Sequence, residues 1–396
     1  MTLVETESDR MKQELGGNRM VRRAFGFDEI ALSPGMQTVD PDDVDVSVTI
    51  AAHKFSIPIF GSAMDSVISP KTAALMSQLG GLGVLNLQGV QTRYPNAEEI
   101  LDEIAGVSRE SYVEFMQKIY TKSIEEDLIS RRIREIKDLG GIAAVSATPQ
   151  VADAYGKIAQ DAGAEIFFVQ STVVSTHHKS KHQGEFNLAA FCKTMTIPVV
   201  VGNCVTYAVA KELMRTGVAA ILVGIGPGAA CTSRGVLGVG VPMGTAIADC
   251  AAARDDFERE TGRRVAIIGD GGMSVGGDIC KALACGADAV MIGSPLARAE
   301  EAPGRGFHWG MATPSPVLPR GTRIQVGRNG SLKTILQGPA KFDDGSQNLV
   351  GAIKTSMGTL GASTIREMQQ VEVVVAPSIL TEGKVFQKAQ SLGMYK

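Results

Sequence analysis

Residues 265–294 read VAIIGDGGMSVGGDICKALACGADAVMIGS. Two short apolar runs, VAIIGD at 265–270 and DAVMIGS at 288–294, stand at its two ends. Each run is hydrophobic at nearly every position, which is typical of strands covered on both faces in a parallel sheet. A glycine-rich turn and a helix-like segment lie between them. The stretch therefore predicts a strand, a helix and a second, parallel strand.

Six earlier runs share this character, at 57–64, 82–86, 142–147, 165–170, 197–203 and 219–225. Most of the segments between the runs have the periodicity of amphipathic helices. Eight strand–helix units predict an α/β fold of the closed (β/α)8 TIM-barrel type. An open doubly wound sheet is the alternative, but no G-x-G-x-x-G motif follows an early strand.

Three segments depart from the repeat, and we expect all of them to belong to one catalytic domain spanning 1–396. Residues 1–56 precede the first strand and are expected to cap the base of the barrel. Residues 87–139 are charged and helix-rich, and are expected to be inserted helices, being marginal for a separate domain. Residues 298–350 are rich in Gly and Pro, which predicts a hairpin and a mobile flap over the carboxyl-terminal face.

The composition excludes several classes of partner. A net charge of −3 gives no basic field for nucleic acid or anionic membranes. The six cysteines form no CxxC pair, which argues against a disulfide framework or a structural zinc site. The amino-terminal residues lack the apolar core of a signal peptide, and no apolar run suits a membrane span. We expect a cytoplasmic protein with small-molecule ligands.

Two glycine clusters follow the last two strands, GDGGMSVGGD at 269–278 and IGSPLA at 292–297. Barrels commonly hold a phosphate at this place with backbone N–H groups. Simple tight turns are the alternative interpretation, but two clusters at the expected strand ends favour phosphate. The sequence thus predicts a phosphorylated substrate.

Cys231 lies in the glycine-rich segment GIGPGAACTSRG after the sixth strand. A nearby cation such as Arg234 favours the thiolate, which is the nucleophilic form. Most lone cysteines are inert core residues, and that remains the interpretation of the other five. Cys231 is the candidate nucleophile.

These segments resemble the IMP dehydrogenase and GMP reductase family, in a CBS-less, dehydrogenase-like subgroup. The resemblance extends over nearly the whole chain and includes GSAMDSV, GGLGVLN, VGNCVT, VGIGPGAACTSRG, the stretch quoted above, EEAPG and TSMGTLGAS. It implies a barrel enzyme, usually a homotetramer. In that family the loop cysteine bonds to C2 of a purine nucleoside 5'-monophosphate while hydride moves to or from a nicotinamide cofactor.

The resemblance also implies roles for individual residues. The catalytic group is Cys231 with Thr232 and Ser233. The substrate-binding residues are Ser62, Met64, Asn203, Arg234, Asp270 at the ribose, Gly272, Gly293 and Ser294 at the phosphate, His308, and Gly310 and Met311 at the purine. The cofactor-binding residues are Gln170, Ser171, Thr172 and Lys179. Carbonyls of Gly226, Gly228 and Cys231 match a loop that binds potassium in many members.

The flap favours reduction over oxidation. Dehydrogenases of the family activate water with an Arg-Tyr pair on a long flap, whereas ATPSPVLPRGTR at 312–323 is short and has no tyrosine. General-base help is typically worth ~10²–10⁴-fold, so its loss matters. We therefore expect a GMP reductase that converts GMP to IMP and ammonia. An IMP dehydrogenase using NAD and a non-catalytic nucleotide-binding paralogue are the alternatives; a Schiff-base aldolase lacks a strand-end lysine.

Several positions depart from the family pattern. Gln170 replaces a usual aspartate and is followed by His177, His178, Lys179, Lys181 and His182, which suits the 2'-phosphate of NADPH, although a solvated charged turn fits equally well. Ser233 stands where the family has Thr, and Ala229 and His308 replace usual phosphate contacts. Arg320 replaces a reductase glutamate, leaving Glu300 and Glu301 as candidates for the acid that protonates ammonia. Residues 87–139 are too short for paired CBS domains.

Overall fold

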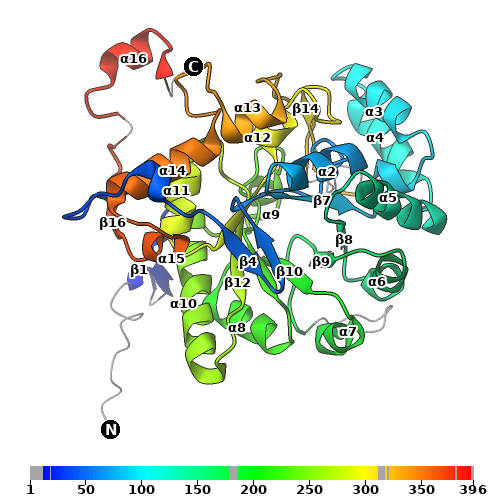
Figure 1. Ribbon diagram of the computed structural model, residues 1–396, viewed down its shortest axis with the longest axis horizontal. Coiled ribbons are helices and arrows are strands. Elements are labelled where there is room, and N and C mark those ends of the chain that lie inside the picture. Colours follow the sequence, from blue (N-terminus) through cyan, green and yellow to red (C-terminus); the bar gives the residue numbers. More distant parts are fainter. Residues whose placement is uncertain are drawn as a thin grey trace.

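The computed structural model describes residues 12–17, 19–177, 186–310, 317–318, 321–379 and 381–393. Eight parallel strands close into a barrel in which each strand pairs with the next in sequence (Figure 1). They are β6 (Ile59–Gly61), β7 (Leu82–Asn86), β8 (Ala144–Ala147), β9 (Ile166–Gln170), β10 (Val199–Cys204), β11 (Ala220–Val223), β12 (Ala266–Asp270) and β13 (Ala289–Ile292). The predicted (β/α)8 barrel is confirmed, and each strand lies within or overlaps one of the eight apolar runs.

Both faces of these strands are buried, which explains their continuous hydrophobicity. On β9, Phe168 belongs to the cluster that fills the barrel, whereas Phe167 belongs to the cluster between strands and helices. On β12 the same alternation places Ile268 inside and Ile267 outside. Successive side chains of a strand point to opposite faces, so a strand covered on both sides is apolar over most of its length, and its polar residues lie near its carboxyl end.

A layer of helices surrounds the strands (Figure 1). The helices that follow the successive strands are α2 (Pro70–Gln78), α5 (Glu126–Asp138), α6 (Ala152–Asp161), α7 (Leu188–Thr194), α8 (Tyr207–Arg215), α10 (Met243–Thr261), α11 (Gly276–Ala284) and α14 (Leu349–Leu360). Local signals set their ends: the Thr206 side chain accepts from the backbone N–H of Val209 at the start of α8, and Gly262 ends α10 with a φ of 73°.

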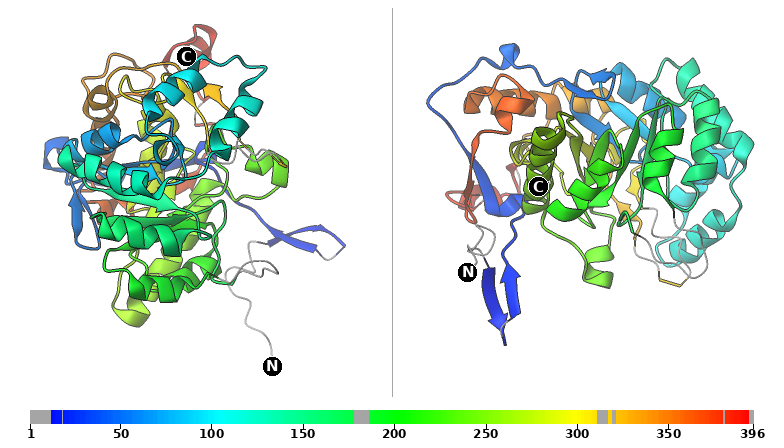
Figure 2. Two further views of the ribbon diagram at one scale, coloured as in Figure 1. Left: turned by 90° about the vertical axis from the view of Figure 1, so that its right-hand side faces the viewer. Right: turned by 90° about the horizontal axis from the view of Figure 1, so that it is seen from below.

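The amino-terminal segment caps the base of the barrel, as expected. The hairpin of β4 (Val48–Ile50) and β5 (His53–Phe55) places Val48, Ile50 and Phe55 in the cluster that fills the barrel. Further out, β3 (Ile30–Ser33) pairs with β16 (Glu372–Val375). The hairpin of β1 (Lys12–Gly16) and β2 (Arg19–Arg22) projects away from the barrel (Figure 2).

The inserted segment contributes two extra helices. Within residues 87–139, α5 is the barrel helix between β7 and β8, while α3 (Ala97–Gly106) and α4 (Tyr112–Thr121) are additional. They form a separate small core with Trp309. The insertion is therefore joined to the segment that follows β13.

The segment 298–350 contains the expected hairpin, formed by β14 (Phe307–His308) and β15 (Ile324–Gln325). It also contains a helix, α13 (Leu332–Gln337), which the Gly and Pro content did not predict. The tip of the flap at 311–316 and 319–320 lies outside the described residues, so its mobility stays a prediction. The remaining short helices are α9 (Ser233–Leu237), α12 (Ser294–Ala297), α15 (Ile365–Met368) and α16 (Val385–Ala389), with 3-10 turns at Phe27–Glu29, Pro41–Asp43 and Val90–Thr92.

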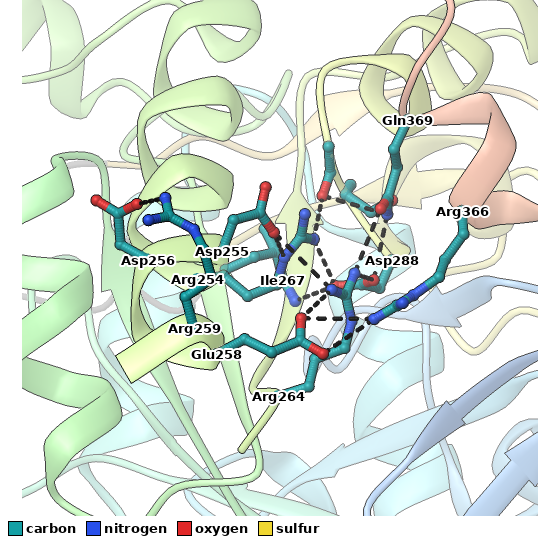
Figure 3. A network of polar contacts seen from close by, with 12 residues as sticks. Arg254, Asp255, Asp256, Glu258, Arg259, Arg264, Ile267, Asp288, Arg366 and Gln369 are labelled. Carbon is teal, nitrogen blue, oxygen red and sulfur yellow. Dashed lines mark hydrogen bonds and ion pairs between the residues drawn. The ribbon is translucent and has the colours of Figure 1, made fainter. Parts of the chain in front are cut away.

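A buried ionic network braces the amino ends of β12 and β13 (Figure 3). The Asp288 carboxylate accepts from Arg254 Nη1 at 3.0 Å, Arg264 Nη2 at 2.7 Å and the backbone N–H of Ile267 at 2.8 Å. The two guanidinium groups and the N–H outweigh the effect of burial and lower the pKa of Asp288. In barrels this face serves stability rather than chemistry.

No helix in the described ranges combines the length and apolar character needed to cross a membrane.

Candidate active site at the carboxyl ends of the strands

A cavity of about 510 Å³ opens at the carboxyl ends of the barrel strands. It brings together most of the residues that the sequence singled out. Those that line it are Ser62, Met64, Gln170, Ser171, Thr172, Asn203, Gly226, Gly228, Cys231, Asp270, Gly272, Gly293, Ser294, His308 and Gly310. Met311 and Lys179 lie outside the described residues.

Three predicted residues lie behind the wall of the cavity, where Thr232, Ser233 and Arg234 begin the turn into α9. Ser233 is buried, and its Oγ accepts from Cys231 Sγ at 3.3 Å. Arg234 Nε donates to the carbonyl of Ile225 at 3.0 Å and Nη2 to that of Val241 at 2.9 Å. Arg234 thus holds the loop together. Burial lowers the pKa of Arg234, and the interaction with Cys231 opposes that change.

The loop that carries Cys231 is a tight turn after β11. The backbone N–H of Cys231 donates to the carbonyl of Gly228 at 3.0 Å. Glycine is required where the loop leaves the strand, because a Cβ on Gly224 would lie 2.3 Å from the carbonyl oxygen of Asp270. The loop that carries Cys231 therefore begins directly beside the carboxyl end of β12.

The two glycine clusters line the same cavity. Gly271 and Gly272 both have positive φ, 80° and 78°, and a Cβ on Gly272 would lie 2.9 Å from Pro227. A Cβ on Gly293 would lie 3.0 Å from the His308 ring. Turns without side chains leave backbone N–H groups accessible, which suits a phosphate group.

Asp270, at the end of β12, forms a polar group with Gln170 of β9 and Asn203 of β10. Its Oδ2 accepts from Asn203 Nδ2 at 2.7 Å and from Gln170 Nε2 at 3.1 Å. Burial raises the pKa of Asp270 to about 6, against the opposing effect of these two hydrogen bonds. At neutral pH it is a carboxylate with free acceptor capacity, which suits the hydroxyl groups of a ribose.

His308 reaches the cavity from β14. Its Nδ1 lies 3.0 Å from Ser66 Oγ, and burial lowers its pKa to about 4. The ring is therefore neutral at neutral pH, so it offers a hydrogen bond but no charge to a ligand.

The candidate site residues taken from the sequence leave out part of the wall, which is formed by Asn86, Gln88, Arg93, Tyr120, Ser146 and Thr148. Asn86, Ser146 and Thr148 follow from the rule that barrel sites lie at strand ends. Nothing in the sequence pattern places Tyr120, which comes from α4. Its hydroxyl donates to Asp65 Oδ2 at 2.5 Å and accepts from Trp309 Nε1 at 3.0 Å.

The two candidate acids from the sequence do not line the cavity. Glu301 Oε2 accepts from the backbone N–H of Leu332 at 2.8 Å, at the start of α13. The adjacent Glu300 is exposed and its N–H donates to the carbonyl of Gly330 at 3.0 Å. Neither glutamate is in place to protonate a ligand.

The loop that the resemblance implies as a potassium site already uses its carbonyls within the chain. The Gly228 carbonyl already accepts from the N–H of Cys231, and the Arg234 guanidinium is fixed on the carbonyl next to Gly226. A cation there would lie beside a fixed positive charge, so these residues do not fit potassium well and we derive no step through it. The part of the chain that the structure describes holds no cluster of three or more His, Cys, Asp or Glu side chains suited to a metal ion.

Comparison with known families gives one matching model. The IMP dehydrogenase / GMP reductase domain matches residues 24–313. The chain is 36% identical over 371 residues to an uncharacterized oxidoreductase of Mycolicibacterium smegmatis, covering 91% of this chain and 99% of the relative. It is 29% identical over 393 residues to the inosine-5'-monophosphate dehydrogenase of Cryptosporidium parvum, covering 89% and 92%.

A solved structure is similar over nearly the whole chain. It is the IMP dehydrogenase/GMP reductase-like protein from Corynebacterium glutamicum, with a TM-score of 0.88 and 35% identity. The match covers 93% of this chain and 99% of that one.

Proposed function

Because the chain belongs to the IMP dehydrogenase / GMP reductase family of oxidoreductases, we propose that it is a GMP reductase that uses NADPH. The substrate is then a purine nucleoside 5'-monophosphate. In this proposal Gly272, Gly293 and Ser294 bind its phosphate, and Asp270 accepts from its ribose hydroxyls. Ser62, Met64, Asn203 and Gly310 surround the rest of the nucleotide. The presence of the phosphate turns and Cys231 in one cavity supports this arrangement.

In the proposed reaction Cys231 Sγ forms a bond to C2 of GMP. The exocyclic amino group takes up a proton and leaves as ammonia, with Ser233 hydrogen-bonded to the sulfur throughout. The nicotinamide of the cofactor, when bound, supplies hydride to C2. The carbon–sulfur bond then breaks, and its electron pair returns to Cys231 as thiolate. Overall, GMP, NADPH and two protons give IMP, NADP⁺ and ammonium.

One observation carries the choice of reduction over oxidation: the Arg-Tyr pair with which dehydrogenases of the family activate water is incomplete in this chain. The flap has no tyrosine between 312 and 323. The described residues that line the cavity include one tyrosine, Tyr120. It cannot take the place of the flap tyrosine with which dehydrogenases of the family activate water. Burial and the carboxyl of Asp65 raise the pKa of Tyr120 well above its usual value, and its proton is committed to Asp65. A tyrosine held in this way stays neutral at neutral pH.

The environment of Gln170 supports NADPH over NAD. An amide here donates to Asp270, whereas the aspartate common in the family would place a second negative charge beside that carboxylate. The loss of this charge favours a cofactor that carries an additional phosphate. Ser171 and Thr172 line the cavity beside Gln170 and complete the proposed cofactor side. A homotetramer and a cytoplasmic location remain predictions.

Absorbance at 340 nm tests the proposal directly. The full-length protein is mixed with GMP plus NADPH in one cuvette and with IMP plus NAD in another. We expect consumption of NADPH in the first and no signal in the second. A signal only with IMP plus NAD would make the protein a dehydrogenase. Binding of either nucleotide without turnover would make it a non-catalytic paralogue.

A further inference from the structure

Among the described residues that line the cavity, one is a lysine or an arginine, and it is Arg93. It follows β7 at the end of the Val90–Thr92 turn, and it is half-buried. Neither the phosphate turns nor the proposed catalytic group involves it. A positive charge in the wall of a ligand cavity therefore has no assigned task.

The backbone fixes this side chain. Arg93 Nε donates to the carbonyl of Gln88 at 3.2 Å, and Nη1 donates to that of Lys122. Its guanidinium carbon lies 5.8 Å from the centre of the Tyr120 ring. Because arginine has five N–H donors and two are used, three make no hydrogen bond to any described residue. The group is rigid and still has donors to offer.

No described carboxylate forms an ion pair with Arg93. Asp65 is the acidic group that influences it most, but the hydrogen bonds to Asp65 Oδ2 come from Tyr120 and from the backbone of Val90. Burial lowers the pKa of Arg93, yet an arginine remains charged at neutral pH. A half-buried cation without a counter-ion lowers the stability of the folded protein, and binding of an anionic ligand would offset this loss.

The ring of strands does not by itself assign Arg93 to one ligand. It follows β7, which is diametrically opposite β11 and two strands away from both β13 and β9. The contacts of its loop point to the β8 and β9 side. The carbonyl of Gln88 accepts from Arg93, and the side chain of Gln88 accepts from the backbone N–H of Thr148 after β8 at 2.8 Å. Arg93 is therefore tied to the side of the cavity that continues to Gln170 on β9, the proposed cofactor side.

We propose that Arg93 binds a phosphate group of the dinucleotide cofactor, by charge-assisted hydrogen bonds from its free donors. The inference rests on the proposed function only in taking the second ligand to be a nicotinamide dinucleotide. The anion is either the diphosphate, common to NAD and NADPH, or the 2'-phosphate of NADPH. Both are phosphates with the same chemistry toward a guanidinium.

Binding of two redox-inert analogues to the full-length protein, measured by calorimetry, tests this role. ADP-ribose carries only the diphosphate, and 2'-phospho-ADP-ribose carries both groups. For Arg93→Gln we expect affinity to fall about 10- to 100-fold, the usual effect of losing charge-assisted hydrogen bonds. Equal losses for both analogues assign the diphosphate, and a loss confined to 2'-phospho-ADP-ribose assigns the 2'-phosphate; each supports the proposal.

Three controls separate binding from folding. Arg131→Gln, on the exposed face of α5, removes an arginine from the same region and should change neither affinity. Arg93→Lys keeps the charge but not the planar fork, and should restore part of the affinity. GMP affinity, measured on every variant, should stay unchanged.

Two results would overturn the proposal. One is an Arg93→Gln protein that unfolds at lower temperature but binds both analogues as the wild type does, which would make Arg93 a structural tie to Lys122. The other is a loss of GMP affinity in place of analogue affinity. Since neither analogue is turned over, the result stands even if the 340 nm assay shows IMP oxidation. Conversely, GMP reduction with an unaffected Arg93→Gln protein would refute this inference alone.

Discussion

Cys231 and Gly321 lie opposite each other in an antiparallel backbone bridge. The next residue, Thr322, donates its N–H to the carbonyl of Ala230 at 3.0 Å, and its Oγ1 lies 2.8 Å from the Tyr112 hydroxyl on α4. Arg323 then donates to the carbonyls of Ile104 and Val107 at the end of α3. The returning strand of the flap thus connects the cysteine loop to the inserted helices.

Tyr112→Phe should weaken this connection. Removing one partly buried hydrogen bond costs about 0.5–1.5 kcal/mol of folding stability. A looser Cys231 loop should also lower kcat several-fold with little change in the KM for GMP, measured at 340 nm. Tyr94→Phe is the matched control, because Tyr94 also donates its hydroxyl from this region, to the carbonyl of Ile119, away from the loop. Equal effects of both variants on kcat would exclude a role for the bridge.

Cys231→Ser should abolish turnover while leaving GMP affinity nearly unchanged. The thiolate is the proposed nucleophile, whereas the proposal assigns the phosphate and the ribose to other residues. Rates at 340 nm and calorimetric titration with GMP check both parts. Undiminished turnover would remove the covalent mechanism. Cys285→Ser is the control, since burial raises the pKa of that thiol to about 11 and it lies outside the cavity lining.

Asp270→Asn should stabilise the unliganded protein and weaken nucleotide binding. The folded pKa of about 6 lies above the usual 3.8, so the buried carboxyl lowers stability by its full amount at pH values above about 6, and this cost disappears progressively between about pH 6 and 3.8. Because the carboxyl borders a cavity, we expect a gain of about 1–2 kcal/mol at pH 7.5, shrinking as the pH falls toward 5. Denaturant unfolding at both pH values checks this. A gain independent of pH would have another origin.

In the wild type, GMP affinity should fall as the pH drops through about 6, because Asp270 then loses the charge that is proposed to accept from the ribose hydroxyls. The phosphate of GMP also loses a charge near pH 6, so calorimetry between pH 5 and 8 compares the wild type with Asp270→Asn. The fall in affinity should be steeper in the wild type. An equal fall in both proteins would assign the pH dependence to the phosphate or to another group.

Asp288→Asn should destabilise the barrel by about 3–5 kcal/mol, the usual cost of leaving buried charges without their partner. Asp288 has a lowered pKa, so its contribution is present at neutral pH and is lost as the pH falls through that lowered value. Thermal and urea unfolding at pH 7.5 measure the loss. Asp255→Asn, an exposed partner of Arg254, should cost less than about 1 kcal/mol. Comparable costs would mean that the network contributes little.

The sequence predicted the barrel because each of its strands is buried on both faces and so reads as an apolar run. It also predicted most of the cavity wall, since Asp270, Gly272 and Cys231 directly follow such runs. It did not predict Arg93 and Tyr120 in the wall. Their place depends on how α3 and α4 pack against Trp309, more than 180 residues away in the chain, which no local pattern encodes. Likewise, the charge pattern alone did not show that Asp288, Arg254 and Arg264 meet.

The hairpin of β4 and β5 limits the directions from which ligands can reach the cavity. Val48, Ile50 and Phe55 close the far end of the barrel, so among the described residues the cavity is open to ligands only from the carboxyl-terminal end, where Cys231 lies. The substrate and the cofactor of the proposed reaction must then both enter from the same end. Where one bound ligand covers the other, we expect the covered ligand to bind first and to leave last.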